Sequence, residues 1–162
     1  MTKHPRMWLW CIMLVPWLSV PFLGKKSIKR FFAASLFITL LIRLESYIAE
    51  KRKWWWFYER LFPKARGETP LLWGQYLIGS MWILKYTYGH FLKFLLVNFF
   101  TDLFFIFPFS DFLKKLGLFS YVRLSRTRVM VIFFVKSLLL YGFQFIKENI
   151  TFANGAGLKQ KN

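Results

Sequence analysis

The sequence predicts an all-α fold, a transmembrane helical bundle of four or five spans. Hydrophobic residues make up 56% of the 162 residues and are gathered in long blocks, without the period of a soluble amphipathic helix or strand. Trp and Tyr residues stand at the edges of these blocks, where amphipathic rings settle at the level of lipid headgroups. The basic residues, which give a formal net charge of +17, lie mostly between the blocks.

A charge excess of this size has two usual meanings, nucleic-acid binding and attraction to anionic lipid. Here the Lys and Arg residues flank apolar segments and form no continuous stripe on a soluble domain. We therefore expect contact with a lipid bilayer that has anionic headgroups, and no nucleic acid. The single cysteine, Cys11, lies inside the first block and is expected to be a small buried hydrophobe.

The first two apolar blocks cover residues 7–23 and 31–49. The first follows a basic start and looks like a secretory signal, but Gly24-Lys25-Lys26 stands where a small-residue cleavage site would be, so an uncleaved span is predicted. The uninterrupted part of the second gives only about 18 Å of helix. Because the hydrocarbon core is about 30 Å thick, this block spans only if it includes Arg43 and Glu45.

Three further blocks complete the bundle. They cover residues 71–88, 91–109 and 129–146. Between the last two, residues 111–128 predict a short interfacial helix and a basic loop, since apolar residues are mixed with cations there. Residues 1–150 are thus expected to form a single integral membrane domain, and the polar residues 151–162 a disordered tail.

The positive-inside rule gives the predicted orientation. With five spans, the side that holds the N-terminus carries the larger share of the cations, which places the N-terminus in the cytoplasm and the protein in a bacterial cell membrane. The segment 24–30 conflicts with this rule, because it puts four basic residues outside: Lys25, Lys26, Lys29 and Arg30. If one of the first two blocks is re-entrant, four spans become the better model, with both termini in the cytoplasm.

A run of cations and aromatic rings follows the second block. Its composition is typical of an interfacial anchor, because headgroups attract both cations and amphipathic rings. A docking site for an anionic lipid or for the acidic tail of a partner protein is the sharper alternative. The residues of this candidate lipid anchor are Lys51, Arg52, Lys53, Trp54, Trp55 and Trp56.

Polar residues also occur within the apolar blocks, where the bilayer makes them costly. In the second block one helical stripe holds Ser35, Thr39, Arg43, Ser46 and Glu50. Such a stripe should face other helices, a water-filled cavity or the interface. On the same helical wheel Glu45 lies off the stripe.

Two charges of opposite sign lie at similar depth in the fourth and fifth blocks. An unpaired charge at the bilayer centre costs about 2.5–3.5 kcal/mol, so Asp102 and Lys136 are predicted to pair. A second cluster, nearer one surface, should join Arg43 to Glu45 or Glu50. The candidate intramembrane polar cluster is an ion or proton path, a binding cavity or a structural pair. Its members are Arg43, Glu45, Glu50, Asn98, Asp102 and Lys136.

The sequence contains none of the P-loop, dinucleotide-binding, nucleophile-elbow and HExxH motifs. We therefore expect no catalytic residue, no cofactor and no metal site. The expected function is that of a structural or accessory membrane component, which packs with itself or a partner protein and engages anionic lipid. The first alternative is a small oligomeric transporter or ion-conducting protein with a polar intramembrane cavity. A membrane enzyme that acts on lipids is the second.

Four segments carry a resemblance to a protein family. They are Pro16-Trp17-Leu18-Ser19-Val20-Pro21, Gly24-Lys25-Lys26, Trp54-Trp55-Trp56-Phe57-Tyr58 and Gly79-Ser80-Met81-Trp82-Ile83-Leu84-Lys85. Over most of its length the chain resembles an uncharacterised family of small multi-pass membrane proteins from endospore-forming Gram-positive bacteria. The resemblance implies a bacterial membrane protein and assigns no activity, ligand or active-site residue.

Overall fold

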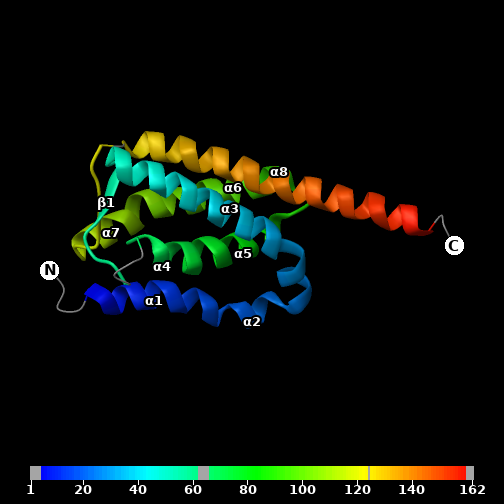
Figure 1. Cartoon of the computed structure of the whole chain (residues 1–162), viewed down its shortest axis with the longest axis horizontal. Helices are drawn as coiled ribbons and strands as arrows, with labels where there is room; N and C mark the ends of the chain where they lie inside the picture. The colour runs from blue at the N-terminus through cyan, green and yellow to red at the C-terminus, as the bar shows by residue number, and fades with distance from the viewer. Residues whose placement is uncertain (1–4, 62–65, 124, 160–162) are drawn as a thin grey trace.

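The computed structural model describes residues 5–61, 66–123 and 125–159. Helical segments lie side by side along the long axis, with the N-terminus near one end and the C-terminus at the other (Figure 1). Among the described residues, four helical stretches are long and apolar enough to cross a membrane: Arg6–Leu23, Lys25–Arg52, Phe91–Lys115 and Arg126–Ala153. The protein is therefore an all-α transmembrane helical bundle, as predicted.

The first stretch consists of α1 (Pro5–Leu18) and α2 (Val20–Leu23). It breaks at Ser19, between Pro16 and Pro21, because proline has no backbone N–H to donate to the helix. The Trp82 indole donates a 2.9 Å hydrogen bond to Ser19 Oγ and so ties the break to the rest of the bundle. Cys11 is exposed on α1, so its predicted burial is wrong.

The second stretch is one continuous helix, α3 (Lys25–Arg52). Gly24, with a φ of 78°, makes the turn before it, and Lys53 ends it in a left-handed conformation. Its 28 residues correspond to about 42 Å of helix, more than the hydrocarbon core of about 30 Å. The second block is thus long enough to span once its charged residues are included.

A central segment of α4 (Thr69–Leu71), η1 (Leu72–Tyr76) and α5 (Leu77–Thr87) follows. It is not one of the four candidate spans, yet its residues form much of the core, with Leu72, Leu77 and Leu84 at most 2% exposed. The segment contacts α1, α3 and α6. Because protein rather than lipid surrounds it, this fifth segment tolerates a less apolar sequence than the other four.

The next stretch joins α6 (Phe91–Phe104), η2 (Phe105–Phe109) and α7 (Ser110–Lys115) without a break. Pro108 lies within η2, where the helix widens into a π-turn. The separate interfacial helix predicted within residues 111–128 is therefore wrong, because α7 continues the fourth block.

A small antiparallel sheet closes one end of the bundle. Strand β1 (Trp55–Phe57) pairs with β2 (Phe119–Tyr121), with Trp55 opposite Tyr121 and Phe57 opposite Phe119. Aromatic residues favour strands. Two of the six residues of the predicted anchor, Trp55 and Trp56, are thus strand residues paired with β2, while Lys51 and Arg52 form the end of α3.

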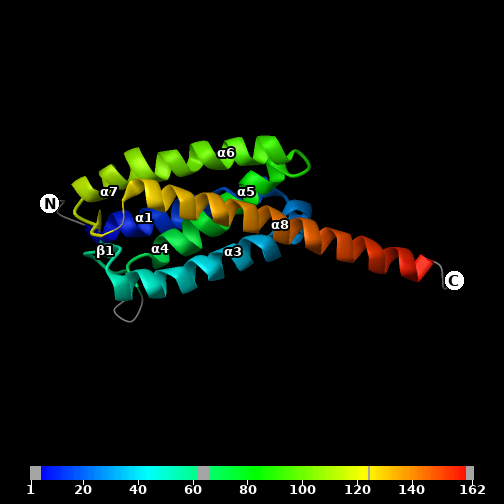
Figure 2. The same cartoon turned by 90° about the horizontal axis from the view of Figure 1, so that it is seen from above.

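The last helix, α8 (Arg126–Lys159), projects beyond the others at the C-terminal end (Figures 1 and 2). The disordered tail predicted from residue 151 is therefore wrong for residues 151–159, and residues 160–162 lie outside the described part. The helix continues because no proline stops it and because each glycine costs only about 1 kcal/mol in a helix that is already formed. Thr151 Oγ1 also donates a 2.8 Å hydrogen bond to Lys147 O.

Candidate functional site

Lys136 of α8 forms an ion pair with Glu45 of α3 inside the bundle. Only 9% of the Lys136 side chain and 13% of the Glu45 side chain are exposed. The Lys136 ammonium also lies 4.3 Å from the centre of the Phe133 ring, on the preceding turn of α8. These contacts supply the partners that a charge needs in low-dielectric surroundings.

The predicted pair of Asp102 and Lys136 is wrong, since the ion pair of Lys136 among the described residues is with Glu45. Asp102 instead lines a cavity that Lys136 also lines. The helical wheel of α3 suggested one buried face and put Glu45 outside it. However, α3 packs against both α5 and α8, so it has two buried faces, and Glu45 lies on the one that meets α8.

The polar stripe predicted on α3 does face the protein interior over most of its length. Ser35, Thr39 and Ser46 are 0%, 3% and 2% exposed. Thr39 Oγ1 donates a 2.7 Å hydrogen bond to Ser35 O, one turn earlier in the same helix. This part of the prediction is confirmed.

Arg43 contacts the start of the central segment, and its predicted pairing with Glu45 or Glu50 is wrong. Its Nη1 lies 3.7 Å from Glu68 Oε1 and 3.4 Å from Thr69 Oγ1. The physical reason is that the chain returns from β1 to the bundle beside α3, which brings a carboxylate distant in sequence to Arg43. Glu68 was missed, because it precedes the third apolar block and no local pattern marks it.

Glu50 pairs with the same returning segment. Glu50 Oε2 lies 2.8 Å from Arg66 Nε, and Glu50 Oε1 lies 3.7 Å from Arg60 Nη2. All three side chains are partly exposed at the end of the bundle. Glu50 therefore belongs to the surface of the bundle end and not to an intramembrane cluster.

Burial raises the pKa of the Glu68 carboxyl above its usual value. A hydrogen bond with Ser46 and the positive charges of Arg43 and Arg66 lower the pKa, but they do not cancel the effect of burial. The folded protein therefore favours the protonated Glu68 carboxyl. This contribution to stability is complete below about pH 4.3, the pKa of an unfolded glutamate, and it is lost as the pH rises through the pKa in the folded state.

We expect the Tm of the wild type to fall relative to that of Glu68→Gln as the pH rises from about 4 to 7. Thermal unfolding in detergent measures this difference, and a Tm difference that does not change with pH would contradict the expectation.

Two cavities share Lys136 and Tyr76 as lining residues. The outer cavity is lined by aromatic rings from β1, η2 and β2 and also by Glu45 and Glu68. The inner cavity is lined by Asp102 and by the side-chain amides of Gln75 and Asn98. Polar groups from distant blocks thus gather around one buried lysine.

The two π-helical segments border both cavities. Tyr76 of η1 and Phe105 of η2 line each of them, and their ring centroids are 6.1 Å apart. A π-turn widens a helix locally and occurs often at functional sites. Sequence reasoning missed these segments, although Gln75 inside the third apolar block was an available signal of a polar lining.

A second polar cluster lies toward the opposite end of the bundle. The Arg30 guanidinium donates two hydrogen bonds to the Glu148 carboxylate, at 2.5 and 2.8 Å. Gln144, which is fully buried, donates a 2.7 Å hydrogen bond to the same carboxylate. This cluster, in which Gln144 and Glu148 lie one turn apart on α8, was not predicted from the sequence.

The comparisons with known proteins give no relative. No family model, no curated protein and no solved structure matches the chain. The resemblance to a family from endospore-forming bacteria therefore stays a prediction, and the structure establishes a helical membrane protein without a family assignment.

Proposed function

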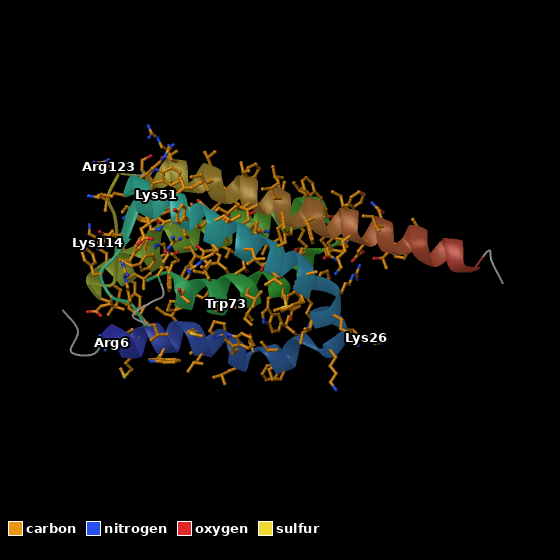
Figure 3. The ribbon with its side chains drawn as sticks, viewed as in Figure 1. Arg6, Lys26, Lys51, Trp73, Lys114 and Arg123 are labelled. Atoms are coloured by element: carbon orange, nitrogen blue, oxygen red, sulfur yellow. The ribbon has the colours of Figure 1, made fainter. Side chains whose placement is uncertain are left out.

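We propose that the protein is a non-enzymatic component of a bacterial cell membrane that binds anionic phospholipid headgroups with its sheet end, and that its N-terminus is cytoplasmic. The basic end consists of the cations around the sheet: Arg6, Lys51, Arg52, Lys53, Arg60, Arg66, Lys114, Lys115, Arg123, Arg126 and Arg128. Figure 3 shows Arg6, Lys51, Lys114 and Arg123 at this end and Lys26 at the other. Lys3 and Lys64 lie outside the described residues.

The observation that carries the proposal is the pairing of β1 with β2. This pairing brings the cations at and just after the end of α3 beside those that flank β2, although about sixty positions separate them in sequence. Anionic lipid attracts each nearby Lys or Arg by about 1 kcal/mol. A surface built from two such segments therefore gathers more attraction than either segment alone.

Most of these cations have no acidic partner among the described residues. Ion pairs occupy Arg6, Arg60, Arg66 and Arg126. The others are exposed and unpaired with any described carboxylate: Lys51, Arg52, Lys53, Lys114, Lys115, Arg123 and Arg128. Their charges are thus open to phosphate groups outside the protein.

A polar hollow at the same end suits a headgroup. It is lined by Lys114, by the hydroxyl-bearing Ser120 and Ser125, and by Asp111, whose charge is paired with Arg126. Ammonium and hydroxyl groups are donors that phosphate oxygens accept. Trp56, 40% exposed on β1 beside this end, adds the amphipathic ring typical of an interface.

The experiment compares two triple variants that remove the same charge from opposite ends. Lys51→Gln, Arg52→Gln, Lys53→Gln changes the basic end, and Lys25→Gln, Lys26→Gln, Lys29→Gln is the matched control. Each protein is purified in mild detergent, and the retained phosphatidylglycerol per chain is measured by mass spectrometry. We expect the first variant to retain at least about tenfold less of this lipid than the wild type, and the control to retain nearly the wild-type amount.

Salt supplies a second check, because interactions of exposed charges weaken as ionic strength rises. Retention of phosphatidylglycerol by the wild type should therefore fall with added salt, while retention of zwitterionic phosphatidylcholine should not. Equal losses in the two triple variants, or no preference of the wild type for the anionic lipid, would contradict the proposal.

A further inference from the structure

The inner cavity is lined by side-chain oxygen atoms that can accept a hydrogen bond or bind a cation. Thr101 Oγ1 donates to Val97 O at 2.7 Å, and the Asn98 amide donates to Phe94 O at 2.9 Å. Ser80 likewise donates to a carbonyl one turn earlier in its own helix. Each of these side chains therefore retains an oxygen that can only accept.

Gln75 adds a further acceptor to the same cavity. Its side-chain oxygen is buried, and no donor from the described residues reaches it. A buried acceptor without a partner loses free energy that a bound ligand can restore. This atom is thus an independent sign that the cavity is built to receive a ligand that acts as an electrophile or a donor.

The charges around the cavity leave one carboxylate uncompensated. Among the described lining residues, Asp102 carries the only negative charge and Lys136 the only positive charge. Lys136, however, is paired with Glu45, which lines the outer cavity and not the inner one. When Asp102 is ionised, the three groups together carry a net charge of −1, which is unfavourable inside a membrane bundle unless a cation balances it.

We infer that the inner cavity binds one small monovalent metal cation, of the sodium class, through the Asp102 carboxylate and the neutral oxygens of Gln75, Ser80, Asn98 and Thr101. Hard cations prefer oxygen ligands, and a single carboxylate matches a single positive charge. This inference goes beyond lipid binding, since the inner cavity and the basic end share no residue. It gives the buried polar cluster a ligand in addition to its structural role.

The experiment uses the full-length protein in mild detergent. Its Tm is measured in NaCl and in N-methyl-D-glucamine chloride at equal concentration, and binding of ²²Na⁺ is measured directly. We expect sodium to raise the Tm of the wild type by about 3–5 °C at a concentration about tenfold above the dissociation constant. We also expect saturable binding of about one ²²Na⁺ per chain, the number that one uncompensated carboxylate allows.

Asp102→Asn should abolish both effects while the protein stays folded. Its Tm without sodium should equal or exceed that of the wild type, because the uncompensated charge is gone. Thr101→Val, which keeps the shape but removes one ligand oxygen, should weaken ²²Na⁺ binding at least about threefold and decides the matter if Asp102→Asn does not fold. Asp111→Asn, which removes a carboxylate outside the inner cavity, is the matched control and should keep the full sodium response.

Either of two results would overturn the inference. One is a wild type whose Tm and ²²Na⁺ binding do not distinguish sodium from N-methyl-D-glucamine. The other is an undiminished sodium response in Asp102→Asn. A loss of phosphatidylglycerol retention in the basic-end variants would affect neither result, so the two proposals fail separately.

Discussion

Lys136→Met should destabilise the bundle by about 3–5 kcal/mol, because it leaves the Glu45 carboxylate buried without its cation. The methionine side chain has a similar length and flexibility, so the loss of charge, not of volume, dominates the effect. Thermal unfolding in detergent would show this as a Tm decrease of about 6 °C or more.

A second substitution identifies the true partner. Glu45→Gln in the Lys136→Met background removes the unpaired charge, and the double variant should recover most of the lost stability, since replacing both members of a buried pair is often nearly neutral. Asp102→Asn in the same background should recover less, because Asp102 forms no ion pair with Lys136 among the described residues. A larger recovery with Asp102→Asn than with Glu45→Gln would contradict the pairing seen in the structure.

The helical framework was predictable because it rests on a property of continuous segments. A long apolar block must form a helix in lipid, where each backbone polar group needs a partner within the segment. The burial of Ser35 and Thr39 also followed from the sequence, since residues four apart share one face of a helix. Hydropathy and helical period thus account for the bundle and for one of its polar faces.

Contacts between distant segments account for what the sequence did not reveal. The partner of Lys136 depends on which face of α3 meets α8, and a helical wheel drawn for one helix cannot specify its neighbours. The partner of Arg43 comes from the chain after β1, and the sheet itself pairs two short segments far apart in sequence. The charge at a given depth was predictable, whereas the identity of its partner required the packing order of the helices.

The first helix passes close to the centre of the bundle at Gly74 of η1. A Cβ atom at this position would lie 2.6 Å from Ile12 O and 2.9 Å from Met13 O, both backbone atoms of α1. Gly79, five residues later on the same central segment, has nothing within 4 Å of the corresponding point. The two glycines therefore differ in their surroundings although they share a helical segment.

Gly74→Ala should destabilise the protein by about 2–3 kcal/mol, because α1 must move away from η1 to admit the methyl group. Gly79→Ala is the matched control and should be neutral or stabilising by up to about 1 kcal/mol, since alanine favours a helix and meets no atom there. Thermal unfolding of both variants in the same detergent measures the contrast. Gly74 is also buried against a helix that is tied to α5 through Trp82 and Ser19, so the displacement of α1 cannot stay local. Equal Tm values for the two variants would mean that backbone contact at Gly74 does not hold α1 against the bundle.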